Sequence, residues 1–203
     1  MIKKQRKIIL VVLAILILFI SGCEKDKEEE KKNMLNGKHN VEIHVKDYGT
    51  IELELDADIA PITVTNFIHL VKDGFYDGLT FHRIMKGFMM QGGDPEGTGM
   101  GGSEETIKGE FSANGISNTL SHVRGVISMA RSQDFDSASS QFFIVHEDST
   151  FLDGKYAGFG KVTNGMDIVD KICDEAKPTD DNGTISREDQ PTIESITYVE
   201  DKK

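Results

Sequence analysis

Two runs of alternating apolar and polar residues open the region that we expect to fold. Apolar residues occupy every second position in 41–45 and again in 51–55, and the residues between them, 46–50, are turn-forming. A period of two is the pattern of a strand with one buried face. The two runs therefore predict an antiparallel β-hairpin.

The next segment changes to a helical period. Apolar residues recur at three- and four-residue spacing between Val64 and Val71, and Pro61 stands where the first turn of a helix tolerates it. Gly74 then offers a stop. A second, shorter helix is predicted over 166–173, where the helical period returns.

Short runs rich in Phe, Ile and Val predict the remaining strands. They lie at 79–84, 88–91, 125–130, 141–146, 157–162 and 192–199. Many short strands separated by turn signals, with only two helices, favour a mainly β fold. We therefore expect a closed antiparallel barrel, and the chain shows no internal repeat.

The N-terminal residues read as a targeting signal. A basic head, Lys3 to Lys7, precedes an uninterrupted apolar run, Ile8 to Ile20. The run is shorter than the ~17–25 residues that span a membrane and fits a secretory signal peptide. It ends in Ile20-Ser21-Gly22-Cys23, which resembles the bacterial lipoprotein motif and implies cleavage before Cys23 and a diacylglycerol thioether on its sulfur. The alternatives are an ordinary signal peptide or an uncleaved anchor, with Cys23 incidental.

Three parts of the chain follow from this pattern. Residues 1–22 form the signal peptide, 23–38 a lipidated N-terminus with a charged, disordered tether, and 39–203 one folded domain. The tether is almost all Glu, Lys, Asp and Asn, too little apolar surface to fold. A functional charge patch is the alternative for this segment, but a run of mixed sign is usually a linker.

The net charge limits the kinds of partner that we expect, and the cysteine content limits how the domain can be stabilised. The chain has 23 basic and 34 acidic residues, and loss of the four basic residues of the signal leaves 19 against 34, a net charge of −15. Such a surface disfavours nucleic acid and anionic membranes, which reward basic patches. After lipidation of Cys23 only Cys173 remains, so no internal disulfide is available. The domain must be held by packing alone.

The candidate chemistry lies in the segment from Phe81 to Asp94. It sets the guanidinium of Arg83 and the carboxamide of Gln91 among large apolar side chains. This combination suits a neutral, partly apolar peptide substrate rather than a reaction that needs a nucleophile or a metal. Strand geometry lets Phe81, Arg83, Phe88 and Gln91 converge on one cleft.

Strand alternation also bears on the histidine next to Arg83. Neighbouring residues of a strand point to opposite faces, so His82 and Arg83 should not both enter one cleft. We therefore expect His82 to pack or hydrogen-bond behind the site.

Four separated motifs together resemble the cyclophilins, the peptidyl-prolyl cis/trans isomerase family. They are FHRIMKGFMMQGGD, GVISMAR, SQFFI and FLDGKYAGFGKV, at 81–94, 125–131, 140–144 and 151–162. The resemblance runs from about Val41 to Val199. It implies a closed eight-stranded antiparallel barrel with a helix capping each open end. It also implies X–Pro isomerisation of proline-containing polypeptides with no cofactor and no metal.

The resemblance carries site roles onto matching positions. Arg83 would be the catalytic arginine, with Phe88 and Gln91 beside it. Met89, Phe143 and Leu152 would form the proline pocket, and Ala130, Arg131 and Gln141 the groove for the preceding residues. The further positions that would contact substrate are His82, Phe151 and Tyr156.

Three positions depart from the best-known pattern of this family. Phe151 replaces a tryptophan, and the loss of its indole N–H implies weak or no cyclosporin binding. Tyr156 replaces a histidine, which keeps the wall of the pocket but changes its polar tip. Arg131 replaces an asparagine whose main chain is expected to touch substrate, and it would favour acidic residues before proline.

Several other motifs point to chemistry that their context does not support. Residues 97–102 fit G-x-G-x-x-G, but Asp94-Pro95 precedes them and no apolar helical period follows, so we expect a surface loop lining the groove. The serines between 128 and 140 lack a G-x-S-x-G elbow, and the six histidines show no metal-ligand spacing. Residues 180–183 lack the calcium-loop spacing and read as a turn.

The sequence thus favours an extracytoplasmic, lipid-anchored prolyl isomerase that assists the folding of exported proteins. The alternative is a non-catalytic module, a chaperone or adhesin, that binds proline segments in the same groove. The joint presence of Arg83, Phe88 and Gln91 favours catalysis, because a pure binder does not need the arginine. A monomer and a Gram-positive outer face are the further expectations.

Overall fold

The computed structural model describes residues 34–200. The predicted signal peptide, Cys23 and most of the predicted tether lie outside the described residues. The sheet consists of β1 Lys38–Val45, β2 Gly49–Asp56, β3 Thr80–Met85, β4 Met89–Asp94, β5 Val126–Met129, β6 Phe142–Val145, β7 Gly158–Asn164 and β8 Ile193–Val199. All eight predicted strands are therefore present, with ends shifted by a few residues.

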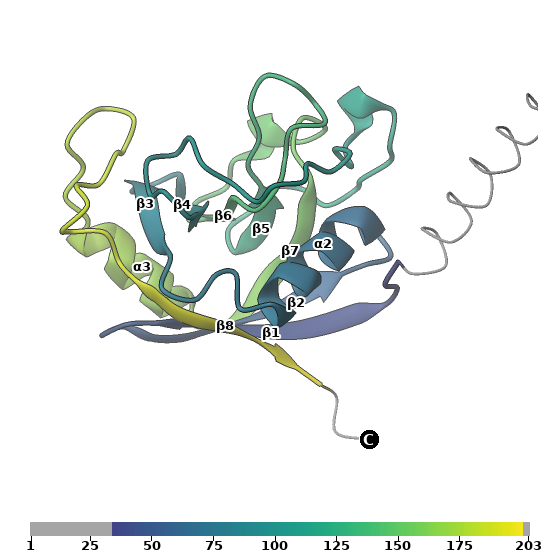
Figure 1. The fold of residues 1–203 in the computed structure, drawn as a ribbon. Coiled ribbons are helices and arrows are strands. Elements are labelled where there is room, and N and C mark those ends of the chain that lie inside the picture. The colour runs from purple at the N-terminus through teal and green to yellow at the C-terminus, as the bar shows by residue number, and fades with distance from the viewer. Residues whose placement is uncertain (1–33, 201–203) are drawn as a thin grey trace, which may run out of the picture. The chain divides into compact units, whose positions relative to one another are not determined.

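The eight strands form one antiparallel sheet in the order β3-β4-β6-β5-β7-β2-β1-β8, which curls on itself (Figure 1). Its edge strands, β3 and β8, meet at a single bridge between Thr80 and Thr192. Ile193 N donates to Leu79 O at 2.7 Å beside this bridge. Pro191, which precedes it, has no N–H to add to a ladder. The barrel predicted as closed is therefore completed by a few bonds rather than by a full strand pair.

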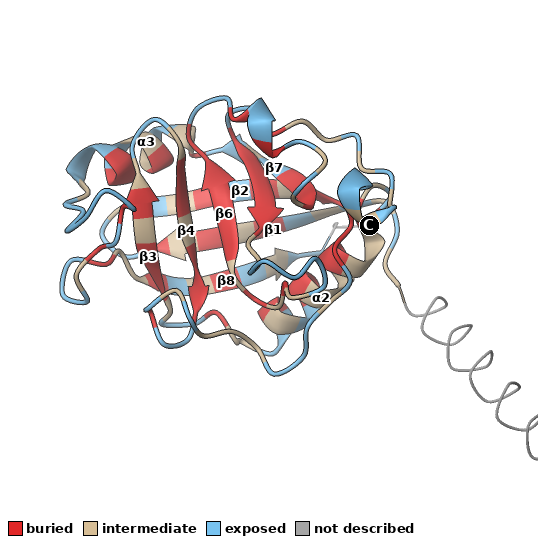
Figure 2. Ribbon diagram, turned by 90° about the horizontal axis from the view of Figure 1, so that it is seen from above, coloured by how far each residue is buried: buried red, intermediate tan, exposed pale blue. Residues whose placement is uncertain are grey.

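Both predicted helices are also present, α2 over Pro61–Lys72 and α3 over Met166–Glu175. They lie at opposite ends of the curled sheet in both views (Figures 1 and 2). The stripe predicted for α2 is buried, and Glu110 accepts from Thr63 N at 2.8 Å at its start. Neither helix is long and apolar enough to cross a membrane, within the described residues.

The central strands are buried on both of their faces (Figure 2). Inside the curled sheet lies the main core, in which Phe142 makes an edge contact with Phe67. On the outer face a separate cluster holds Met89, Val126, Phe143, Val145 and Leu152. Successive residues of β6 thus serve two different apolar regions.

The first strand begins three residues before the predicted run. Lys38 pairs with Asp56 of β2, and just before it Gly37 N donates to Asp58 Oδ1 at 2.8 Å. Leu35 packs against the core, and its N–H donates to Thr65 Oγ1 at 2.9 Å. Backbone pairing does not require apolar side chains, which is why hydrophobic alternation did not mark these residues.

Candidate active site

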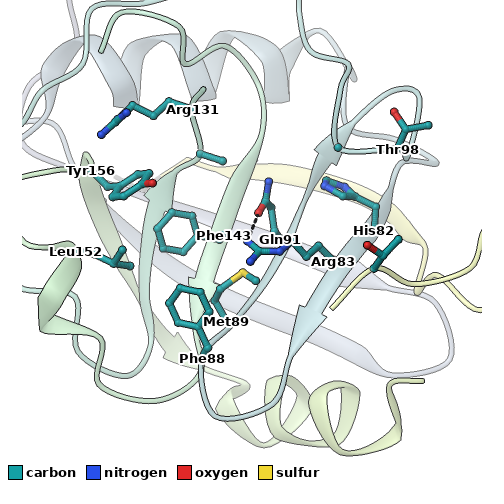
Figure 3. A pocket seen from close by; sticks show the side chains of 13 residues that line it. His82, Arg83, Phe88, Met89, Gln91, Thr98, Arg131, Phe143, Leu152 and Tyr156 are labelled. Carbon is teal, nitrogen blue, oxygen red and sulfur yellow. Dashed lines mark hydrogen bonds between the residues drawn. The ribbon is translucent and has the colours of Figure 1, made fainter. Parts of the chain in front are cut away.

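A pocket of about 270 Å³ opens over the outer face of β4, β6 and β5, where the separate apolar cluster lies (Figure 3). Of the catalytic and substrate-binding residues that the resemblance implied, all but Gln141 and Phe151 line it. Its lining residues are His82, Arg83, Phe88, Met89, Gln91, Thr98, Gly99, Ala130, Arg131, Phe143, Leu152, Tyr156 and Thr184.

One end of the pocket is apolar. Phe143 from β6 and Met89 from β4 are almost fully buried in its floor. Leu152 belongs to a short 3-10 helix, Thr150–Leu152, and forms a side wall. Phe151 of the same turn is 62% exposed and packs on Phe88 with ring centroids 5.6 Å apart. The predicted contact residue Phe151 is therefore at the rim. Phe143, Met89 and Leu152 form an apolar slot that is large enough for a small ring.

The other end of the pocket carries the guanidinium of Arg83. This half-buried side chain extends from β3, and its Nη1 donates to Gln91 Oε1 at 3.2 Å on the adjacent β4 (Figure 3). Its Nε donates to Asn182 O at 2.7 Å. Burial lowers the pKa of Arg83, but a guanidinium remains charged at neutral pH. A fixed cation therefore faces the apolar slot.

Gln91 is itself held by a second amide. Its Nε2 donates to Gln141 Oε1 at 2.8 Å, and Gln141 Nε2 donates to Gly101 O at 2.7 Å and to Gly99 O at 3.1 Å. Because each amide nitrogen donates away from the arginine, the oxygen of Gln91 faces Arg83. The loop over 97–102 thus borders the groove, as the sequence indicated, and its carbonyls hold the amide of Gln141, which in turn holds Gln91.

The expectation from strand alternation that His82 lies behind the site was wrong, whereas its contact with substrate stays a prediction. Phe81 pairs with Gly92 and Arg83 pairs with Gln91, so His82 is an extra residue in a β-bulge. A bulge breaks strict alternation, and His82 and Arg83 both line the pocket. His82 is 4% exposed, and neither ring nitrogen has a hydrogen-bond partner among the described residues. Burial lowers its pKa, which keeps it neutral.

The bulge also moves Phe81 away from the cleft. Phe81 is fully buried in the main core, where its ring makes an edge contact with Phe142 at 6.1 Å. The expectation that Phe81 converges with Arg83 was therefore wrong, because it assumed an unbroken strand between them.

A hydrogen-bonded chain that the sequence did not reveal, with a buried histidine and serine and an exposed aspartate, supports the floor of the pocket. His122 Nδ1 lies 2.9 Å from Asp153 Oδ1, and His122 Nε2 lies 3.0 Å from Ser128 Oγ. The imidazole stacks on Phe143 with a centroid distance of 6.1 Å. Ser128 is fully buried and does not line the pocket, so it cannot attack a substrate. The hydrogen-bonded chain instead fixes the ring of Phe143.

Arg131 lines the pocket, and its side chain packs against the pocket residue Tyr156. Its guanidinium lies 4.6 Å from the ring centre of Tyr156. Its Nη2 donates to Lys155 O at 2.8 Å, which fixes the cation against that ring. The preference for acidic residues before proline stays a prediction.

Three further contributors to the site come from loops, and none of them was predicted individually. Thr98 and Thr184 line the pocket, and Asn182 binds Arg83 through its carbonyl. No sequence signal marks a backbone carbonyl. Over residues 34–200, no group of three or more His, Cys, Asp or Glu side chains is placed to hold a metal ion.

Comparison with known proteins gives consistent matches. Residues 40–198 match the family described as cyclophilin type peptidyl-prolyl cis-trans isomerase/CLD. The chain is 48% identical over 125 residues to peptidyl-prolyl cis-trans isomerase B of Bacillus subtilis, covering 62% of this chain and 84% of that protein. It is 44% identical over 145 residues to a peptidyl-prolyl cis-trans isomerase-like 2 of Rhizopus delemar, covering 71% of this chain but only 26% of that protein.

Solved structures agree with this match. A cyclophilin type peptidyl-prolyl cis-trans isomerase of Cryptosporidium parvum superposes with a TM-score of 0.71 at 29% identity, covering 81% of this chain and 99% of that one. A second crystal structure of the Cryptosporidium protein, in the presence of the dipeptide Ala-Pro, gives a TM-score of 0.70 at 30% identity.

Proposed function

Because the chain belongs to the cyclophilin-type peptidyl-prolyl cis-trans isomerase family and is an isomerase of X–Pro bonds, we propose that it assists the folding of exported proteins from a lipid anchor outside the cytoplasm. Two features support the proposal. The pocket joins an apolar slot to a fixed guanidinium, and the N-terminal sequence carries a lipoprotein-like signal ending at Cys23.

The reaction is a simple bond rotation, but it requires a large rate acceleration. Rotation about a peptide bond has a barrier of ~18–20 kcal/mol, and X–Pro bonds interconvert in tens to hundreds of seconds. Turnover in milliseconds requires a factor of about 10⁵, or roughly 7 kcal/mol at ~1.4 kcal/mol per decade. No covalent bond is made or broken. The protein has only to bind the twisted state better than either planar state.

Arg83 is placed to make that distinction. In the twisted state the proline nitrogen regains its lone pair and becomes an acceptor for a guanidinium N–H. A charge-assisted hydrogen bond contributes about 1.5–3 kcal/mol, so Arg83 cannot supply the whole effect. The remainder comes from a preorganised, water-poor site in which Phe143, Met89 and Leu152 hold the ring.

The substrate class is proposed from the shape and polarity of the slot. Its apolar end suits a pyrrolidine ring, and the groove beside Ala130 and Arg131 suits the residues that precede proline. The presence of Ala-Pro with the Cryptosporidium protein supports a proline-containing peptide as ligand. We expect weak or no cyclosporin binding, because Phe151 offers no indole N–H.

The location is proposed from the N-terminal sequence. A basic head, an apolar run and Cys23 precede a stretch of Glu and Lys that would hold the domain away from the membrane. A folding catalyst that consumes no ATP suits a compartment without ATP.

The lipid anchor can be tested by labelling. Bacteria that express the full chain are grown with labelled palmitate and fractionated. We expect the wild-type chain to carry the label and to sediment with membranes, and the Cys23→Ser variant to lose the label. Cys173→Ser is the matched control, because it removes the other thiol, and it should keep the label. An unlabelled wild-type chain, or a Cys23→Ser chain that is labelled equally, would refute the anchor.

A further inference from the structure

Two oxygen acceptors hold the guanidinium of the catalytic Arg83. Gln91 on β4 accepts from Nη1, as described above, and the carbonyl of Asn182 accepts from Nε at 2.7 Å. Asn182 lies 99 residues further along the chain. Nη2 also donates to Met85 Sδ at 3.2 Å, so each nitrogen of the guanidinium has a partner and its direction is fixed. The loop that carries Asn182 therefore takes part in setting the direction of the guanidinium.

That loop has a shape imposed by one carboxylate. Asp180 Oδ1 accepts from Asn182 N and from Thr184 N, both at 3.0 Å, and Asp180 Oδ2 accepts from Thr184 Oγ1 at 2.8 Å. The bonds to Thr184 and Asn182 lower the pKa of Asp180, so it is ionised at neutral pH. The turn thus depends on Asp180 for three hydrogen bonds.

The loop is also docked against the strand that carries Arg83. Ile84 N donates to Gly183 O at 2.8 Å, and Ile185 N donates to His82 O at 2.9 Å. Gly183 has a φ of +84°, and a Cβ there would lie 2.5 Å from Met85 Cγ. The position therefore requires glycine. The loop behaves as a short added strand on the free edge of β3.

We propose that this loop positions the catalytic arginine, with Asp180 fixing the turn and the Asn182 carbonyl holding Nε. Asp180 acts through Arg83, so it is a positioning residue rather than a catalytic one. The inference rests on the isomerase activity of the chain. It predicts a loss of kcat with little change in KM, because the slot that binds the ring is left intact.

Asp181 provides a matched control. It is the next residue, carries the same charge, is exposed, and its side chain makes no hydrogen bond within the described part of the chain. Asp180→Ala should lower kcat about fivefold to tenfold, less than the complete loss of a hydrogen bond to a charged group, because the Asn182 carbonyl is loosened and not removed. Asp181→Ala should leave kcat unchanged. Asp180→Asn keeps an acceptor for the backbone N–H groups and should restore part of the activity.

A double-mutant cycle separates positioning from general damage. In an Arg83→Ala background, Asp180→Ala should lower the residual kcat no further, because there is no guanidinium left to orient. An equal loss in both backgrounds would overturn the proposal. So would an equal loss with Asp181→Ala.

The Nε–H signal of Arg83 in an NMR spectrum gives a readout that does not depend on activity. We expect it to be protected from exchange with water in the wild type and in Asp181→Ala, and to lose that protection in Asp180→Ala. Should Asp180→Ala fold poorly, Thr184→Val removes only the hydroxyl bond to Asp180 and should weaken protection partially. Unchanged protection in these variants contradicts the proposal, whereas an inactive wild type with a protected Nε–H contradicts the isomerase function alone.

Discussion

The two histidines nearest the slot differ in their contacts but share one electrostatic consequence. His82 has no hydrogen-bond partner within residues 34–200, and His122 is bonded at both nitrogens, yet burial lowers the pKa of each. For His122 the loss of solvation outweighs the opposing effect of Asp153. Both imidazoles are therefore neutral above the usual histidine pKa of about 6.5.

This predicts a nearly flat pH profile. Between pH 6 and 8 the charge of Arg83 does not change, and the lowered pKa values of His82 and His122 move their titration toward the acid side, so kcat/KM on an X–Pro tetrapeptide should vary little. A protease-coupled assay corrected for the pH dependence of the protease measures this. A steep bell-shaped curve would reveal an acid–base step and would contradict the mechanism.

His82 and His122 also determine how the stability of the fold changes with pH. A histidine whose pKa is lower in the folded state stabilises fully above its unfolded pKa, about 6.5. This contribution is lost as pH falls from that value toward the folded pKa. Acidification should thus weaken the packing of His82 and His122 while Arg83 stays charged.

At the scale of elements, the loop after β4 is built around one buried carboxylate. Asp94 is 1% exposed and accepts backbone N–H groups of Glu96, Thr98 and Gly99 at 2.6–3.0 Å. Burial alone would raise the pKa of Asp94, but the backbone donors outweigh it and lower the pKa. Its stabilising effect is therefore present above the unfolded pKa of about 3.9 and is lost as pH falls through the folded value.

We expect Asp94→Ala to destabilise the fold by about 1.5–3 kcal/mol, because the donors lose a charged acceptor. It should also raise KM, since Gly99 and Gly101 of this loop anchor Gln141. Urea unfolding and steady-state kinetics measure the two effects. Glu104→Ala removes an exposed carboxylate nearby and serves as the control. An Asp94→Ala protein as stable as this control would show that the loop does not depend on the carboxylate.

At the scale of the whole molecule, the described domain is held by packing without a disulfide. Cys173 is a free thiol at 2% exposure, and burial raises its pKa to about 12. A thiol in this state is neither ionised nor accessible at neutral pH.

Cys173 should therefore report on global unfolding. In the full chain carrying Cys23→Ser, a thiol reagent should not react in native buffer and should react rapidly in denaturant. The melting temperature should not depend on a reductant. A fast reaction in native buffer would mean that α3 opens independently of the sheet.

The sequence alone determined the elements and their order. Alternation of apolar residues located the first two strands, helical spacing located both helices, and enrichment in Phe, Ile and Val located the other six strands, because these patterns are recorded locally in the chain. Residues such as Arg83, Gln91, Phe143 and Leu152 could also be proposed, since each lies in a motif that resembles the cyclophilins.

Only the tertiary structure decided what depends on contacts between distant segments. Four such features produce no periodic pattern in the sequence. They are the bulge at His82, the single bridge that completes the barrel, the hydrogen bonds from Asp153 through His122 to Ser128, and the bond from Arg83 to the carbonyl of Asn182. Backbone groups and register shifts are independent of side-chain identity, so they appear only when the chain has closed on itself. The nature of the slot could thus be inferred from residues, whereas the direction of its guanidinium required the fold.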